Sequence, residues 1–171
     1  MSLSAFIGTR LLVVACICSA AFACPARPDN DDVKKELEAA YAKRDKAFKD
    51  KDGALIKSFE ADDYIQKTKD GTVADRAIVD PQTDQLLSIV KEIRILTTTV
   101  DKVTPGKEPN QYLAEVSSKG DFTIAGGDGA LHQVVASAKL RDTWIKTKDG
   151  WKIKYHEELE SATMLDGKPI E

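Results

Sequence analysis

The spacing of hydrophobic residues predicts two helices at the start of the folded part of the chain. Apolar side chains recur at helical intervals between residues 33 and 48, and Asp31 and Asp32 precede them. Carboxylates suit the first turn of a helix, because they meet free backbone N–H groups and the positive end of the helix dipole. We therefore expect a helix from Asp31 to about Lys51, with Tyr41 and Arg44 on its apolar stripe.

A second, shorter helix is expected directly afterwards, capped by Asp52 and ended by the pair Asp62-Asp63. The segment 64–68 then has the composition of a strand, and Asp70-Gly71 has that of a tight turn. The pair Asp80-Pro81 is typical of a helix start, with Asp as the N-cap and Pro in the first turn. This third helix is expected to bury apolar side chains up to Ile93.

The remainder of the pattern is typical of β-strands. Strands are expected at 93–100, 111–117 with 122–124, 131–147 and 151–159, separated by loops and by glycine-containing turns. The break in the second of these is placed at residues 119–121, where a glycine lies. The helices come first along the chain and most of the strands come last. This order indicates an α+β fold, with the helices packed on one face of a curved antiparallel sheet.

The first residues have a different pattern. Residues 11–22 form an unbroken apolar run, which follows Arg10 and precedes the small-x-small sequence Ala21-Phe22-Ala23. This arrangement predicts a signal peptide over residues 1–23, a linker over 24–30 and a folded domain over 31–171. The run is shorter than the roughly 20 residues that cross a bilayer, so an uncleaved anchor is the less favoured alternative. We therefore expect a secreted or periplasmic protein.

Cysteine usage adds one alternative. Cys16 and Cys18 lie within the predicted signal peptide, so cleavage would leave Cys24 as the first residue and without a partner for a disulfide. A cysteine at that position is also the site at which bacterial lipoproteins are lipidated. Cys24 is therefore a lipidation candidate, and a lipid anchor in the cell envelope is the alternative localisation, although residues 21–23 are a poor lipoprotein signal.

Composition excludes several classes of partner and cofactor. The net charge of the 171-residue chain is −3, with acidic and basic residues interspersed, which gives no basis for nucleic-acid binding. The chain has two histidines, and neither they nor the cysteines have the spacing of a zinc site. We expect no metal and no cofactor, and contact with a membrane only through the signal peptide or a lipid anchor.

Candidate chemistry lies in the last hairpin. If Asp149-Gly150 is the two-residue turn, Trp144 faces Tyr155 and Asp142 faces Glu157, and all four share the more apolar face. His156 would then lie on the opposite face; a one-residue shift would exchange the two faces. Two facing carboxylates on a buried face are candidates for acid–base catalysis, for anchoring a ligand, or for an ion pair with Arg44.

Two segments of the chain resemble the nuclear transport factor 2-like superfamily. They are "AYAKRDKAFKDKDGALIKSFEADDYI" (40–65) and "RDTWIKTKDGWKIKYHE" (141–157), and the chain is most similar to the SnoaL-like and "domain of unknown function 4440" branch. The resemblance implies a cone-shaped, cystatin-like curved sheet with helices on its concave face, and often a homodimer. Relatives include ketosteroid isomerase, whose catalytic positions correspond here to Arg44 and Thr68. Because neither residue type can do that chemistry, steroid isomerase activity is not expected.

These observations favour non-covalent binding of a small, partly apolar molecule inside the cone. The expected ligand-binding residues are Tyr41, Arg44, Asp142, Trp144, Tyr155 and Glu157, with the two tryptophans also suited to core packing. The alternatives are an acid–base enzyme of the isomerase, cyclase or dehydratase type that uses Asp142 or Glu157, and a non-catalytic dimerisation or accessory module. The sequence does not decide whether the protein is an enzyme, but it leans toward binding without catalysis.

Overall fold

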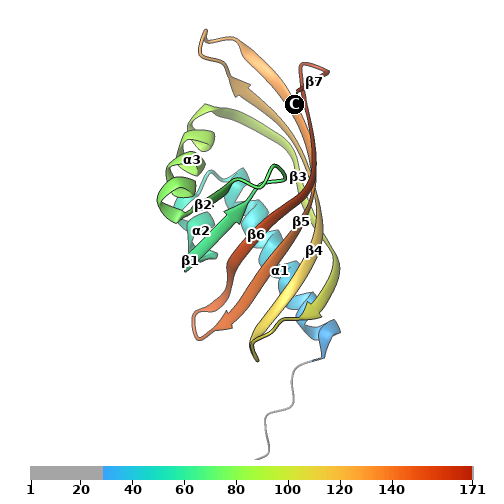
Figure 1. Cartoon of the computed structure of the whole chain (residues 1–171). Coiled ribbons are helices and arrows are strands. Elements are labelled where there is room, and N and C mark those ends of the chain that lie inside the picture. The colour runs from blue at the N-terminus through green and yellow to red at the C-terminus, as the bar shows by residue number, and fades with distance from the viewer. Residues whose placement is uncertain (1–28, 171) are drawn as a thin grey trace, which may run out of the picture.

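A computed structural model describes residues 29–170, in which three helices pack against one face of a seven-stranded sheet (Figure 1). The helices are α1 (Asn30–Lys49), α2 (Gly53–Ser58) and α3 (Arg76–Ile89). The strands are β1 (Glu60–Lys67), β2 (Val73–Asp75), β3 (Val90–Pro105), β4 (Gln111–Ala125), β5 (Leu131–Thr147), β6 (Gly150–Leu165) and β7 (Lys168–Ile170). The predicted signal peptide, most of the linker and Cys24 lie outside the described residues.

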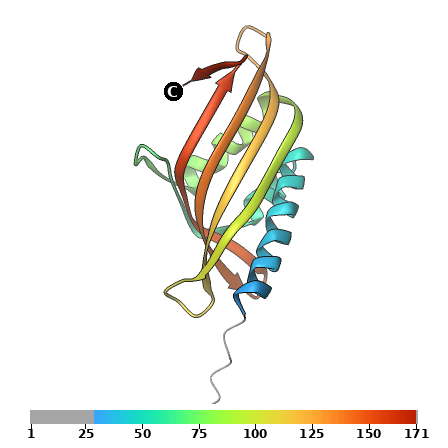
Figure 2. The same cartoon turned by 90° about the vertical axis from the view of Figure 1, so that its right-hand side faces the viewer.

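The sheet is curved and open, and its strands follow the order β2-β1-β6-β5-β4-β3, with β7 paired to β6. Figure 2 shows the face of this sheet that no helix covers, which we call the helix-free face. The expected α+β class is therefore confirmed. One pairing, between β1 and β6, is parallel, so the sheet is mixed rather than wholly antiparallel.

The first two helices begin where the sequence predicts. The side chain of Asp29 accepts a hydrogen bond from the backbone N–H of Asp31 at the start of α1. Asp52 does the same for α2, accepting from the N–H of Leu55 at 2.9 Å. Both contacts satisfy N–H groups that a helix start leaves without an intrahelical partner.

Several predicted boundaries are wrong, and among them α3 ends at Ile89 and β3 begins at Val90, before the expected Ile93. Strand β1 already begins at Glu60, so Asp62 and Asp63 belong to a strand and do not end the second helix. Helix α3 begins at Arg76, because the side chain of Asp75 caps it by accepting from the N–H of Ile78 at 3.3 Å. Pro81 therefore lies inside the helix, and Asp80 is free for another role.

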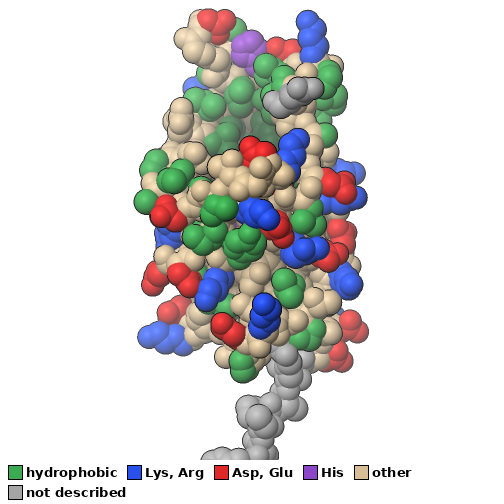
Figure 3. All heavy atoms as spheres, viewed as in Figure 1, with side chains coloured by type: hydrophobic (Ala, Val, Ile, Leu, Met, Phe, Trp, Pro, Cys, Tyr) green, Lys and Arg blue, Asp and Glu red, His purple; other side chains and the backbone are tan. Residues whose placement is uncertain are grey.

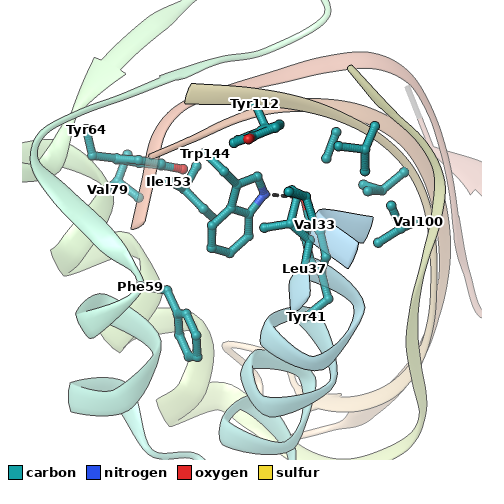
Figure 4. Packing of buried hydrophobic residues seen from close by; sticks show 13 residues of the cluster. Val33, Leu37, Tyr41, Phe59, Tyr64, Val79, Val100, Tyr112, Trp144 and Ile153 are labelled. Atoms are coloured by element: carbon teal, nitrogen blue, oxygen red, sulfur yellow. Dashed lines mark hydrogen bonds between the residues drawn. The ribbon is translucent and has the colours of Figure 1, made fainter. Parts of the chain in front are cut away.

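The main core lies between α1 and the half of the sheet that is lower in Figure 1, which we call the lower half. Figure 4 shows Trp144 in its centre, surrounded by Leu37 and Tyr41 from α1, Tyr112 from β4 and Phe59, and most of these side chains are fully buried. The rings of Tyr41 and Trp144 meet edge to face, with centroids 5.1 Å apart. Trp144 therefore packs in the core, as the sequence predicts, with close contacts around its ring.

The long strands extend beyond the helices at the other end of the molecule. In Figure 1, β4 and β5 continue past α3 and end in a hairpin that overhangs it. Figure 3 shows a hollow beneath this hairpin with hydrophobic side chains in it. The expected break of β4 at residues 119–121 is absent from the described strand, which pairs with β5 without interruption. Within residues 29–170, no helix has an apolar stretch long enough to cross a membrane.

Candidate ligand-binding site

A cavity of about 370 Å³ lies where the sheet extends beyond the ends of the helices. Its walls come from α1, α3 and the concave face of β3, β4 and β5, and they are predominantly apolar. The lining residues are Tyr41, Arg44, Asp45, Phe48, Leu86, Leu87, Val90, Ile93, Leu96, Thr98, Ser118, Phe122, Ile124, Val134 and Leu140. The volume falls within the range of roughly 300–1,000 Å³ that is typical of small-molecule sites.

Small residues on the concave face keep this space open. Gly120, Ala136 and Ala138 alternate inward on β4 and β5 beside the cavity-lining Ser118. The ring of Phe122 lies so close to Gly120 that a Cβ added at that glycine would be only 2.3 Å from two ring carbons. A larger residue at position 120 would therefore displace Phe122, which forms part of the wall.

Arg44 lines the cavity from α1, as the sequence predicts for a residue on the apolar stripe. Its guanidinium lies over the ring of Phe48, with Cζ 5.2 Å from the ring centroid. Its Nε is buried and has no hydrogen-bond partner among residues 29–170. The expected ion pair with Asp142 or Glu157 is not found among the described residues, where Asp142 instead bonds to Tyr41 and His156.

Below the cavity floor, three buried side chains and the partly exposed His156 form a hydrogen-bonded network. Asp142 is 1% exposed and accepts from the Tyr41 hydroxyl at 2.5 Å through one oxygen. Its other oxygen lies 2.7 Å from Nδ1 of His156. The Tyr41 hydroxyl in turn accepts from Nε1 of Trp144 at 2.9 Å, the contact drawn dashed in Figure 4. Both oxygens of Asp142 are thus engaged within the protein.

The network holds Asp142 ionised and Tyr41 protonated. Burial by itself would raise the pKa of Asp142, but the charge and hydrogen bond of His156, the Tyr41 hydroxyl and the charge of Arg44 together hold it below the ordinary value. Burial, followed by the adjacent Asp142 charge, raises the pKa of Tyr41 well above its ordinary value. Asp142 is therefore a fixed acceptor that orients His156.

His156 lies on the concave face, opposite to the first expectation from the sequence. The turn of the hairpin pairs Thr147 with Gly150, and Trp144 then faces Ile153. The next pair is Thr143 with Tyr155, so Lys154 is an extra residue that forms a bulge. A bulge of one residue exchanges the two faces of the strand beyond it. As a result His156, not Glu157, faces Asp142.

The same bulge sends Tyr155 and Glu157 to the helix-free face. Glu157 lies 3.1 Å from Lys67 and 3.6 Å from Arg141, in a surface group of charges. The predicted pairs Trp144–Tyr155 and Asp142–Glu157 are therefore wrong. Of the six predicted ligand-binding residues, Tyr41 and Arg44 line the cavity, Asp142 and Trp144 lie buried beneath it, and Tyr155 and Glu157 are on the other side of the sheet.

Between β1 and α3 lies a second buried carboxyl group. Glu60 is 4% exposed, and burial, followed by a hydrogen bond with Asp80, raises its pKa to about 7. One oxygen of Glu60 and one of Asp80 have no hydrogen-bond partner within the described chain. Arg76 lies 3.7 Å from Glu60 and 3.3 Å from Asp80. The carboxyl group of Glu60 is therefore partly protonated at neutral pH and becomes fully protonated as the pH falls.

Sequence reasoning missed most of the cavity wall. Phe122, Ile124, Val134 and Leu140 alternate inward on two paired strands, and that period-two pattern was the available signal. Within residues 29–170 there is no group of three or more His, Cys, Asp or Glu side chains that could hold a metal ion.

Comparison with known proteins identifies the fold. An NTF2-like protein from Cytophaga hutchinsonii ATCC 33406 superposes with a TM-score of 0.59 at 11% identity, covering 77% of this chain and 98% of that one. A ketosteroid isomerase-like protein from Erwinia carotovora atroseptica SCRI1043 gives 0.57 at 13% identity, covering 76% and 98%. No family model matches the sequence, and no curated protein matches it.

A scytalone dehydratase-like protein from Novosphingobium aromaticivorans DSM 12444 is similar to the same degree. Its TM-score is 0.58 at 10% identity, covering 77% of this chain and 87% of that one. The chain therefore has the NTF2-like fold, as the resemblance implied. At these identities the likeness concerns the fold, and one fold supports many functions.

Proposed function

We propose that this protein binds a small, largely apolar molecule in the cavity between α1, α3 and the concave face of the sheet. One observation carries the proposal: a space of about 370 Å³ with a mainly hydrophobic wall stands beside the solid core of the same sheet. Protein interiors are otherwise close-packed, so an apolar cavity of this size that opens toward a surface hollow favours a ligand.

A neutral fluorescent probe, N-phenyl-1-naphthylamine, tests the proposal directly. Ser118→Phe would fill the cavity from β4, whereas Ser137→Phe adds the same ring to an exposed position on the helix-free face. We expect the probe to bind the parent protein and Ser137→Phe, and to bind Ser118→Phe at least tenfold more weakly. Equal binding by the two variants, or none by the parent, would contradict the proposal. Mass spectrometry of the protein purified from its own host would then identify a co-purified ligand.

The second candidate is an acid–base enzyme of the isomerase, cyclase or dehydratase type. The Asp142–His156 pair favours it, because an aspartate that holds Nδ1 of a histidine leaves Nε2 for proton transfer. Nε2 of His156 has no hydrogen-bond partner in the described chain, and the side chain is 15% exposed. In this arrangement His156 is the base and Asp142 positions it, while Glu157 takes no part.

Proton exchange separates catalysis from binding alone. Once a ligand is identified, incubating it with the protein in deuterated water should introduce deuterium at an acidic carbon if His156 transfers protons. His156→Gln should abolish the exchange without weakening binding by more than about twofold. A ligand that binds and never exchanges would leave binding as the function and contradict the enzymatic alternative.

We further propose that the chain acts outside the cytoplasm, after removal of residues 1–23. The support is the apolar run at 11–22 with its small-x-small end. Mass spectrometry of the mature N-terminus tests this: a free Cys24 indicates secretion, a lipid-modified Cys24 indicates an anchor, and an intact Met1 contradicts export.

Pairing of two copies through the sheet is a separate proposal. The expected contact included Arg141, and that residue now lies beside Glu115 and Glu157 on the helix-free face. Such a charged surface is unusual at the core of a stable interface. Light scattering at increasing concentration measures whether the homodimer forms, and a monomer throughout would contradict it.

A further inference from the structure

Arg44 differs from the other residues of the cavity wall. Of the described residues that line the cavity, it alone carries a positive charge, and most of its neighbours there are hydrophobic. Its Nε is fully buried without a hydrogen-bond partner in residues 29–170. A buried donor without an acceptor destabilises a protein, so this arrangement requires an explanation.

The acidic groups near Arg44 do not supply the missing acceptor. Asp45, also in the wall, accepts from the backbone N–H of Thr98 at 2.8 Å and from its hydroxyl at 3.0 Å. Asp142 is occupied by Tyr41 and His156. Glu60 lies 3.7 Å from Arg76, and burial raises its pKa to about 7, which removes much of its charge at neutral pH. Asp45 and Asp142 are therefore already engaged, and Glu60, although one of its oxygens has no hydrogen-bond partner, forms no hydrogen bond or ion pair with Arg44 within residues 29–170.

We infer that the ligand carries a carboxylate, and this inference rests on the proposed binding function. The carboxylate binds the guanidinium of Arg44, while the apolar part of the ligand lies against the wall of the cavity. A guanidinium is planar and presents paired N–H donors, which match the two oxygens of a carboxylate. A single cation suits a monoanion, whereas a phosphate dianion would ordinarily be met by several basic groups. The hydroxyl of Ser118, which also lines the cavity, is a further donor.

Three probes with the same apolar chain and different head groups test this inference. Decanoate, decanol and decyltrimethylammonium can each compete with bound N-phenyl-1-naphthylamine at pH 7. We expect decanoate to bind at least tenfold more tightly than decanol, and the ammonium compound to bind most weakly. If decanol or the ammonium compound binds as tightly as decanoate, the inferred carboxylate is wrong although the cavity still binds apolar molecules.

Substitution of Arg44 assigns the preference to this residue. Arg44→Met keeps the apolar stem and removes the donors, and it should weaken decanoate binding about tenfold or more while changing decanol binding less than about twofold. Lys43→Met, an exposed neighbour on α1, is the matched control and should preserve the preference. Arg44→Lys should retain part of the preference for decanoate over decanol. If Arg44→Met is poorly folded by circular dichroism, Arg44→Gln replaces it.

The two proposals fail in different ways. A neutral probe that does not bind the parent protein would contradict the binding function itself. A neutral probe that binds, combined with a decanoate-to-decanol ratio that Arg44→Met leaves unchanged, would contradict only the role of Arg44 and the carboxylate.

Discussion

The two halves of the sheet, built from the same strands, differ in what covers their concave face. The lower half lies under α1 and is packed solid around Trp144, Tyr41 and Leu37. The upper half extends past α3, and its inward-facing Phe122 and Val134 meet a cavity instead of another layer. An apolar strand face therefore becomes part of a core or of a cavity wall according to what lies opposite.

The largest expected effect concerns the centre of the lower half. Trp144→Ala should lower the free energy of unfolding by about 3–5 kcal/mol, because it removes a fully buried indole and leaves a cavity. Urea denaturation followed by circular dichroism measures the change. Phe122→Ala in the upper half is the matched comparison, and an equal loss there would contradict the distinction between core and cavity wall.

The buried Glu60 should make stability depend on pH. Its pKa in the folded protein is raised from 4.5 to about 7, so its contribution is fully present below about pH 4.5 and is lost as pH rises through 7. We expect about 2–3 kcal/mol to be lost over this range, measured by urea denaturation at several pH values.

Glu60→Gln imitates the protonated carboxyl group and sharpens this test. The variant should be more stable than the parent at pH 8 and equally stable near pH 4.5. Glu38→Gln, at an exposed position on α1, is the control and should follow the parent curve. A parent curve that does not fall between pH 5 and 8, or a Glu60→Gln curve that runs parallel to it, would contradict the raised pKa of Glu60.

The hydrogen-bonded network beneath the cavity should contribute less than the indole itself. Tyr41→Phe leaves Nε1 of Trp144 without its acceptor and removes a donor from Asp142, which should lower the free energy of unfolding by about 1–3 kcal/mol. Tyr155→Phe, on the helix-free face, should change it by less than about 0.5 kcal/mol. Thermal unfolding ranks the two variants, and equal effects would indicate that the network is not important for stability.

The smallest effect on stability is expected in the cavity wall, where binding should change instead. Phe122→Ala should lower the free energy of unfolding by about 1 kcal/mol, because the ring borders empty space on one side. Binding of N-phenyl-1-naphthylamine should weaken about threefold to tenfold in the same variant. A variant that loses stability like Trp144→Ala and still binds the probe normally would reverse the assignment of the two halves.

Much of the secondary structure could be predicted from local patterns. The apolar stripe of α1, the cap at Asp52 and the full extent of β5 are present as expected. The sequence does not locate the start of α3, because Asp75 and Asp80 are both suitable caps and the choice depends on the short pairing of β2 with β1. Of the site, Tyr41 and Arg44 could be predicted from the stripe, whereas the wall on β3–β5 was overlooked.

By itself the sequence determined the fold class, the helix that carries Tyr41 and Arg44, and the apolar alternation of the long strands, because these depend on periodicity and on contacts between near neighbours. Tertiary structure alone decided that a bulge at Lys154 sets His156 against Asp142 and sends Glu157 to the helix-free face. Tertiary structure also decided that β4 and β5 extend beyond the helices and leave a cavity there. Bulges and relative lengths are settled by packing between distant segments, and no short stretch of sequence contains that information.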